Sequence, residues 1–173
     1  MNEAMQNLLT RRSCRAYKPD LIPDAVLADI LEAGTYAATG MGKQSPIIIA
    51  VTNKEMRDRL SKLNAAVMGA SNDPFYGAPI VCIVLADKNI GTYLYDGSLV
   101  MGNLMNAAHA NGIASCWIHR AKEVFASEEG KQILADLGIT GDYEGIGNCI
   151  LGYAAAPEAD PKPRKENYVY YIK

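Results

Sequence analysis

The chain has 173 residues, 49% of them hydrophobic and 21% charged, with a formal net charge of -2. These values are typical of one soluble domain with a real core, and they argue against a general nucleic-acid-binding protein, which is usually basic. No apolar run reaches the roughly 18–20 residues that a membrane helix needs, and residues 1–10 lack the basic and apolar regions of a signal peptide. We therefore expect a cytoplasmic protein whose scattered cysteines are free thiols.

The first half of the chain alternates helix and strand patterns. Apolar residues at helical spacing predict helices over residues 3–9 and 24–34, and a β-branched run predicts a strand over residues 47–52. Between them lies a glycine-rich loop at residues 39–45. Asn53 is a favourable N-cap, so a further helix is expected to begin directly after it.

The second half continues the alternation. A continuous apolar run predicts a strand buried on both faces over residues 79–86. The remaining predicted elements are a helix at 96–111 closed by Gly112, a strand at 115–119, a helix at 122–137 and a strand at 145–153. Since no repeat or linker divides the chain, we expect one α+β domain over residues 1–173.

The C-terminal tail has an unusual composition. Residues 157–165 are rich in proline and charge, and residues 168–171 are aromatic and β-branched. Such an ending favours a paired strand, either at an edge of the same sheet or on a second subunit.

Two basic clusters are candidate phosphate ligands. The first combines three arginines and a hydroxyl, Arg11, Arg12, Ser13 and Arg15, and guanidinium groups bind phosphate oxygens with charge-assisted hydrogen bonds. The alternative is a solvated helix end. The second is the basic group at residues 162–165, which is otherwise a solvated tail stiffened by prolines.

Other apparent nucleotide-binding motifs and a metal site lack residues that they require. Gln44 stands where a P-loop needs serine or threonine, and Ile150 replaces the third glycine of a dinucleotide fingerprint. His109 and His119 are the two histidines, without a carboxylate or cysteine cluster beside them, so no metal site is expected. The small residues before Trp117 fit either core packing or a flat cofactor lying against a strand.

The order of the motifs carries a resemblance. Arg-Arg-Ser-x-Arg at 11–15 is followed by the loop at 39–44, Ala-Pro at 78–79, Cys-Trp-Ile at 116–118, and Gly-Tyr at 152–153 before the Lys-Pro-Arg-Lys tail. Over nearly its whole length the chain resembles the short forms of the nitroreductase family. One departure is clear, since that family usually has asparagine where this chain has Gly42.

The resemblance implies a nitroreductase-like α+β fold, with a central, mainly antiparallel or mixed sheet flanked by helices. It also implies an intertwined homodimer that exchanges the C-terminal extension 154–173 and holds one FMN at each of two interfaces. By position, the cofactor-binding residues would be Arg11, Arg12, Ser13 and Arg15 with Lys162 and Arg164 at the phosphate and ribityl chain, Thr39, Gly42 and Gln44 from the partner's loop, and Ile118 and His119 beside the ring.

The activity implied is ping-pong electron transfer from NADH or NADPH, through FMN, to a nitroaromatic, quinone or similar small acceptor. In such an enzyme the flavin carries the chemistry, so no catalytic side chain is expected. Two alternatives remain, namely a flavin-binding or redox-sensing dimer without turnover and a dimer that has lost the cofactor.

Overall fold

The computed structural model describes residues 1–158 and 160–173, and its centre is a four-stranded sheet. The strand order is β1-β2-β4-β3, and every neighbouring pair is antiparallel. The strands are β1 (Pro46–Val51), β2 (Ile80–Asp87), β3 (Ala114–Ile118) and β4 (Tyr143–Gly152). All of β2 up to Ala86 is buried, which confirms the expectation of a strand covered on both faces.

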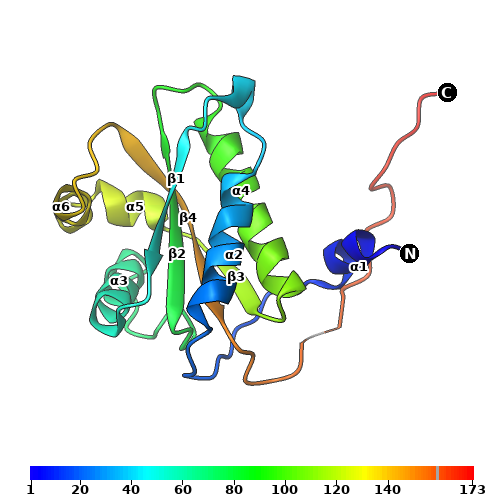
Figure 1. Ribbon diagram of the computed structural model, residues 1–173, viewed down its shortest axis with the longest axis horizontal. Coiled ribbons are helices and arrows are strands. Elements are labelled where there is room, and N and C mark those ends of the chain that lie inside the picture. The colour runs from blue at the N-terminus through cyan, green and yellow to red at the C-terminus, as the bar shows by residue number, and fades with distance from the viewer. Residues whose placement is uncertain (159) are drawn as a thin grey trace.

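Helices cover both faces of this sheet (Figure 1). One face carries α2 (Asp24–Thr35) and α4 (Tyr93–Ala110), and the other carries α3 (Lys54–Val67), α5 (Ala121–Ala126) and α6 (Glu128–Asp136). Asn53 caps α3 as predicted, because its side chain accepts the Met56 N–H at 2.9 Å. The layered α+β architecture expected from the sequence is confirmed.

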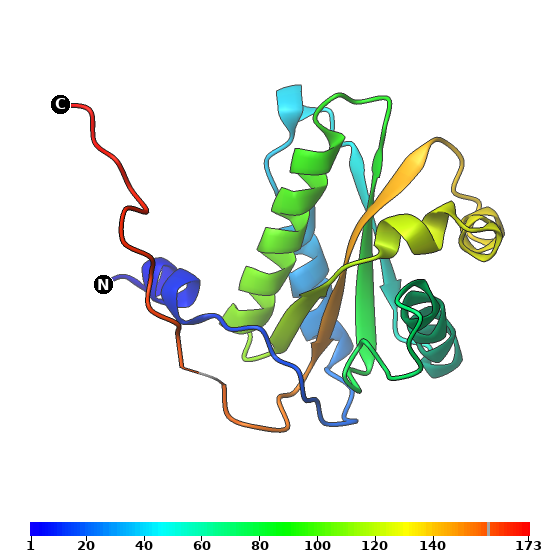
Figure 2. The same cartoon turned by 180° about the vertical axis from the view of Figure 1, so that it is seen from behind.

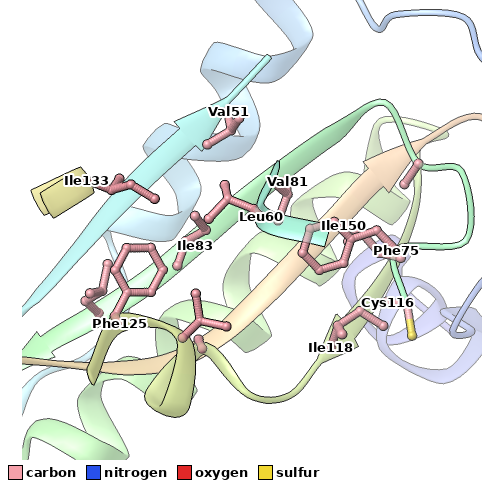
Figure 3. Packing of buried hydrophobic residues seen from close by; sticks show 14 of the residues in the cluster. Val51, Leu60, Phe75, Val81, Ile83, Cys116, Ile118, Phe125, Ile133 and Ile150 are labelled. Atoms are coloured by element: carbon pink, nitrogen blue, oxygen red, sulfur yellow. The ribbon is translucent and has the colours of Figure 1, made fainter. Parts of the chain in front are cut away.

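Two apolar cores follow from this layering. Strand residues alternate between the faces, so Ile83 joins the core under α3, α5 and α6, whereas Val84 joins the core under α2 and α4. Figure 3 shows the first core, where Phe125 from α5 and Leu60 from α3 surround the side chains of the strands. The sheet is thereby a rigid platform for the segments at its edges.

The N-terminal helix α1 (Glu3–Thr10) stands apart from these layers and docks on the end of α4 (Figure 2). Its Asn7 side chain donates to the Asn106 carbonyl at 2.9 Å, and the Thr10 hydroxyl lies 2.8 Å from Nε2 of His109. Both chain termini lie on this side of the molecule. The residues that follow α1 therefore start from a fixed position.

One predicted helix differs from the structure. The helix expected over residues 122–137 is two helices, since Ser127 is extended and its hydroxyl accepts the Gly130 N–H at 3.1 Å as the N-cap of α6. This capping bond competes with continuation of the helix. For the tail, pairing within its own sheet is not seen, since Tyr168 to Ile172 form no strand within the chain and their side chains are exposed. Pairing with a second subunit stays a prediction.

Candidate functional site

The arginine-rich segment at residues 11–15 is held along the outer edge of β3. The Cys14 backbone N–H donates to the Ser115 carbonyl at 3.0 Å, and Tyr17 forms an antiparallel bridge with Ala154 just beyond β4. Backbone pairing at both ends therefore fixes the path of this segment, so its side chains project from a rigid base.

The two neighbouring arginines have different surroundings. Nη1 of Arg11 is enclosed and has no hydrogen-bond partner among the described residues. Arg12, by contrast, folds back and donates to the carbonyls of Leu9 at 2.9 Å and Arg11 at 2.8 Å. Buried polar groups are nearly always paired, so the enclosed Nη1 of Arg11 stands out as a buried donor without a partner. Ser13 and Arg15 are exposed.

The glycine-rich loop contains the short 3-10 helix η1 (Gly40–Gly42). Its backbone is left-handed at Met41 (φ 54°), Gly42 (φ 65°) and Gln44 (φ 49°). A Cβ at position 42 would meet nothing within 4 Å. Asparagine also tolerates this backbone region, so glycine here leaves the loop path unchanged and removes only a side chain.

A cavity of about 460 Å³ lies beside this loop, and its lining residues come from α2, α4 and β1. Thr39 and Gln44 contribute polar groups to a lining that is otherwise mostly apolar, including Ile48 and Val100. The structure thus brings two of the three predicted loop residues to one cavity. Gly42 is exposed and does not line it.

The corner after β3, at Ile118 and His119, is held by two buried asparagines. Asn64 of α3 and Asn148 of β4 both donate to the His119 carbonyl, at 2.8 and 3.1 Å. Arg120 is left-handed (φ 74°), and its Nε donates to the Asn64 side-chain oxygen at 2.9 Å. Such backbone conformations cost about 1–3 kcal/mol and persist where the surroundings hold them. The corner is therefore strongly constrained.

Trp117, one residue before this corner, packs where β4 has a glycine. A Cβ on Gly147 would lie 2.6 Å from the indole nitrogen of Trp117. Glycine is required for this close approach, and Gly145 is required likewise because a Cβ there would lie 2.3 Å from the Ala121 backbone. Packing therefore accounts for the Gly-Ile-Gly sequence without any nucleotide motif.

The C-terminal basic residues form no polar contact with the first cluster among the described residues. Lys162 and Arg164 are exposed, and the Arg164 guanidinium donates to the Lys162 carbonyl at 3.2 and 2.6 Å. Across residues 1–158 and 160–173, no hydrogen bond or salt bridge joins them to residues 11–15. Within the described part of one chain, the two clusters are therefore not joined by a polar contact.

The cysteines are all free, and Cys82, Cys116 and Cys149 are buried. Burial raises the pKa of Cys82 to about 12 and holds that of Cys149 well above its ordinary value, so both stay protonated. Cys14 is half-buried, and its thiol lies 3.1 Å from the Ala16 carbonyl.

The described part of the chain contains no group of three or more metal-ligating side chains. Nor does it contain a helix of the length and apolarity that crossing a bilayer requires.

Comparison with known proteins identifies the family. Residues 8–79 match the model of the nitroreductase family. A protein of Archaeoglobus fulgidus, provisionally named an NADH dehydrogenase/NAD(P)H nitroreductase, is 30% identical over 97% of this chain and 91% of its own length. The chain belongs to the nitroreductase family.

Solved structures agree with this membership. A nitroreductase with bound FMN from Bacteroides fragilis is 28% identical, covers 100% of both chains and superposes with a TM-score of 0.91. A second FMN-bound nitroreductase, from Desulfitobacterium hafniense, is 26% identical with a TM-score of 0.90 and the same coverage. The nitroreductase-like fold expected from the motif order is confirmed.

Several polar residues of the site region escaped sequence reasoning. Asn148 interrupts an apolar strand, and Asp96 is a buried carboxylate near the start of α4, so each was visible as a polar residue in an apolar segment. Asn64 is 1% exposed but sits in an ordinary amphipathic helix, where nothing in the sequence distinguishes it from a surface residue.

Proposed function

We propose that this member of the family is a cytoplasmic FMN-dependent oxidoreductase. It takes electrons from NADH or NADPH and passes them to a nitroaromatic, quinone or similar small acceptor by a ping-pong mechanism. Residues 1–173 act as a single FMN-binding domain in this proposal. The observation that carries it is the enclosed Nη1 of Arg11, which has no partner in the described chain and lies in the segment that the family resemblance assigns to the phosphate.

The residues present fit the cofactor. A phosphate dianion needs several charge-assisted donors, and Arg11, Ser13, Lys162 and Arg164 offer guanidinium, hydroxyl and ammonium groups. Arg15 would contact the ribityl chain, and Arg12 would support the segment through its backbone bonds. Thr39, Gly42 and Gln44 would contact FMN from the partner's loop, with Ile118 and His119 beside the ring.

Bound FMN supplies the hydride and electron transfer, which no side chain of this chain offers. The chain's own residues would bind FMN, orient it and shield it from water. The asparagine-held corner at His119 keeps one backbone wall in place, and the mostly apolar cavity beside Thr39 and Gln44 suits flat acceptors. The nicotinamide donor and the acceptor would use the same opening in turn.

Homodimer formation is part of the proposal, and β1 supports it. β1 is an edge strand, and apolar cavities flank it on both faces, about 460 Å³ beside Ile48 and about 340 Å³ beside Ile49. All five residues of the exposed tail from Tyr168 to Ile172 are aromatic or β-branched. A partner's tail laid along β1 would pair its backbone and fill the smaller cavity beside Ile49, and the same exchange would carry Lys162 and Arg164 across the interface.

Exposed apolar side chains on two helices also favour a second copy. Soluble monomers rarely expose large contiguous apolar patches. The side chains concerned, each at least 47% exposed, are Met5, Leu8 and Leu9 on α1 and Leu94, Tyr95 and Leu99 on α4.

The test is the absorption spectrum of the purified protein, followed by anaerobic mixing with NADH or NADPH. We expect a flavin spectrum, release of FMN on denaturation, and rapid bleaching by a nicotinamide that reverses on adding a quinone or nitroaromatic. Bound FMN without bleaching would indicate the flavin-binding or sensing dimer. Protein that neither contains nor takes up FMN would contradict the proposal altogether.

A further inference from the structure

The carboxylate of Asp96 is buried at the start of α4, with 3% of the residue exposed. It accepts three hydrogen bonds, from the Gly40 backbone N–H at 2.9 Å, the Ser45 hydroxyl at 2.7 Å and the Thr92 hydroxyl at 3.0 Å. Gly40 and Ser45 stand at opposite ends of the glycine-rich loop. One carboxylate therefore ties both ends of that loop to the helix.

The loop between these ties needs such support. Met41 and Gln44 are not glycines, yet both have left-handed backbones, a conformation that costs roughly 1–2 kcal/mol per residue. Met41 is 86% exposed and gains no packing in return. The Ser45 carbonyl also accepts the Asp87 N–H at 3.0 Å, but the other bonds of the loop are short-range, such as the Gln44 N–H to the Thr39 hydroxyl at 3.1 Å.

Packing at Gly40 reinforces the tie. A Cβ at this position would lie 2.3 Å from the hydroxyl of Thr92, so the loop backbone fits against the start of α4 only with glycine there. Burial opposes ionisation of Asp96, but the bonds from Gly40, Ser45 and Thr92 outweigh it and hold the pKa of the carboxyl below its ordinary value. Asp96 is therefore a charged acceptor, and hydrogen bonds to charged groups are the stronger kind.

We propose that Asp96 is a positioning residue for flavin binding, which holds the loop at residues 39–44 of one subunit in the conformation that contacts FMN in the site of its partner. This inference rests on the proposed function, because that function assigns the loop to the partner's cofactor. It adds a residue that touches no cofactor and acts through Gly40 and Ser45.

The first test compares two carboxylates that have similar structural roles. Asp73 also organises a loop, since it accepts bonds from Arg57, Ser61 and two backbone N–H groups near α3. Asp96→Ala should weaken FMN binding by about tenfold or more, as expected for losing bonds to a charged group, whereas Asp73→Ala should stay within about threefold of the parent. Visible circular dichroism should report an altered flavin environment only in Asp96→Ala.

A milder pair keeps the test valid if an alanine variant of either aspartate fails to fold. The Ser45 hydroxyl donates to Asp96 at 2.7 Å, and the Ser61 hydroxyl donates to Asp73 at 2.6 Å. Ser45→Ala should weaken FMN binding several times more than Ser61→Ala does, although both remove one buried hydroxyl donor of the same kind.

Conservative replacement separates positioning from bulk stability. Asp96→Asn keeps an oxygen for the Gly40 N–H, and its amide can donate to the hydroxyls of Ser45 and Thr92, which rotate to accept. It should recover FMN affinity to within about threefold of the parent. Hydrogen exchange of the apoprotein gives a readout without cofactor, since amides of residues 39–45 should exchange at least about tenfold faster in Asp96→Ala but not in Asp96→Asn.

Mixed dimers test the action across the interface. Consider a dimer of one Arg11→Met subunit and one Asp96→Ala subunit. If each loop acts on the FMN site of its partner, the site of the Arg11→Met subunit receives the altered loop and so has both changes. The site of the Asp96→Ala subunit then has a parental Arg11 and a parental loop, and so has neither. This mixed dimer should bind one FMN with parental affinity. No tight site would be left if the loop served its own subunit, and that result would overturn the proposal.

Several further results would contradict the proposal or the function on which it rests. An Asp96→Ala protein that binds FMN within about threefold of the parent, or a control that weakens FMN equally, would remove the positioning role. An Asp96→Asn protein as weak as Asp96→Ala would remove the hydrogen-bond explanation. Failure of the parent itself to bind FMN would instead contradict the proposed function, and the apoprotein exchange would still report on the loop.

Discussion

Replacing Arg11 with methionine should separate stability from cofactor binding. Its Nη1 is enclosed without a partner in the described chain, and an unpaired buried donor costs roughly 1–3 kcal/mol. Methionine removes that donor and keeps an apolar side chain of similar length. The apoprotein of Arg11→Met should therefore be as stable as the parent or more stable, by up to about 1 kcal/mol.

Binding of FMN should change in the opposite direction. Losing a hydrogen bond to a charged group costs roughly 1.5–3 kcal/mol, which is about 10- to 150-fold in affinity. Arg11→Met should lose this much for FMN and much less for riboflavin, which lacks the phosphate. Arg12→Met is the matched control, since Arg12 donates to the carbonyls of Leu9 and Arg11, and it should leave FMN affinity nearly unchanged.

The assays are urea unfolding of the apoproteins at one matched protein concentration and calorimetric titration with FMN and riboflavin. A destabilised apoprotein of Arg11→Met would mean that the guanidinium is paired within the protein. Parental FMN affinity in Arg11→Met, or an equal loss of riboflavin, would refute the assignment of Arg11 to the phosphate.

Four further predictions follow from the same structure. Arg164→Ala should purify with substoichiometric FMN and regain activity on adding FMN, and parental FMN content would make the tail an ordinary solvated segment. Deleting residues 157–173 should give aggregated or FMN-free protein. If light scattering finds a monodisperse monomer for the full chain or for the shortened one, that result would count against the exchanged homodimer. Cys14→Ser should keep both FMN and turnover, and loss of turnover with FMN retained would give the thiol a catalytic role. Burial opposes ionisation of Asp73, but hydrogen bonds, chiefly from Arg57 and Ser61, lower the pKa of its carboxyl below the ordinary 3.8. The stabilisation that the charged carboxylate gives is therefore lost as the pH falls through the pKa of the folded state. Asp73→Asn should lose less stability than the parent from about pH 5 downward, and parallel acid-unfolding curves of the two proteins would contradict this.

Local signals in the sequence predicted most elements of the fold. The apolar run of β2 and the cap at Asn53 depend on neighbours within a few residues, and both appear where expected. The break at Ser127 was missed because Lys122 to Leu137 keeps a helical pattern across it. An N-capping serine inside such a pattern is a weak signal until the capping bond to Gly130 is seen.

The candidate site was predictable only in part, because its geometry depends on residues far apart in the sequence. The residue types of the two segments suggested both basic clusters, but only the structure distinguishes the surroundings of Arg11 from those of Arg12. Asp96 binds a loop 56 residues away at Gly40, and Asn64 binds the His119 carbonyl 55 residues away. No local pattern predicts such contacts.

The central claim is that the chain binds FMN and uses it to move electrons from a nicotinamide. Stopped-flow mixing of the FMN-loaded protein with NADH and with NADPH, without oxygen, tests it most directly. We expect at least one of them to bleach the flavin band rapidly and a quinone or nitroaromatic to restore it. A protein that holds FMN through many minutes with either nicotinamide and shows no bleaching would contradict it.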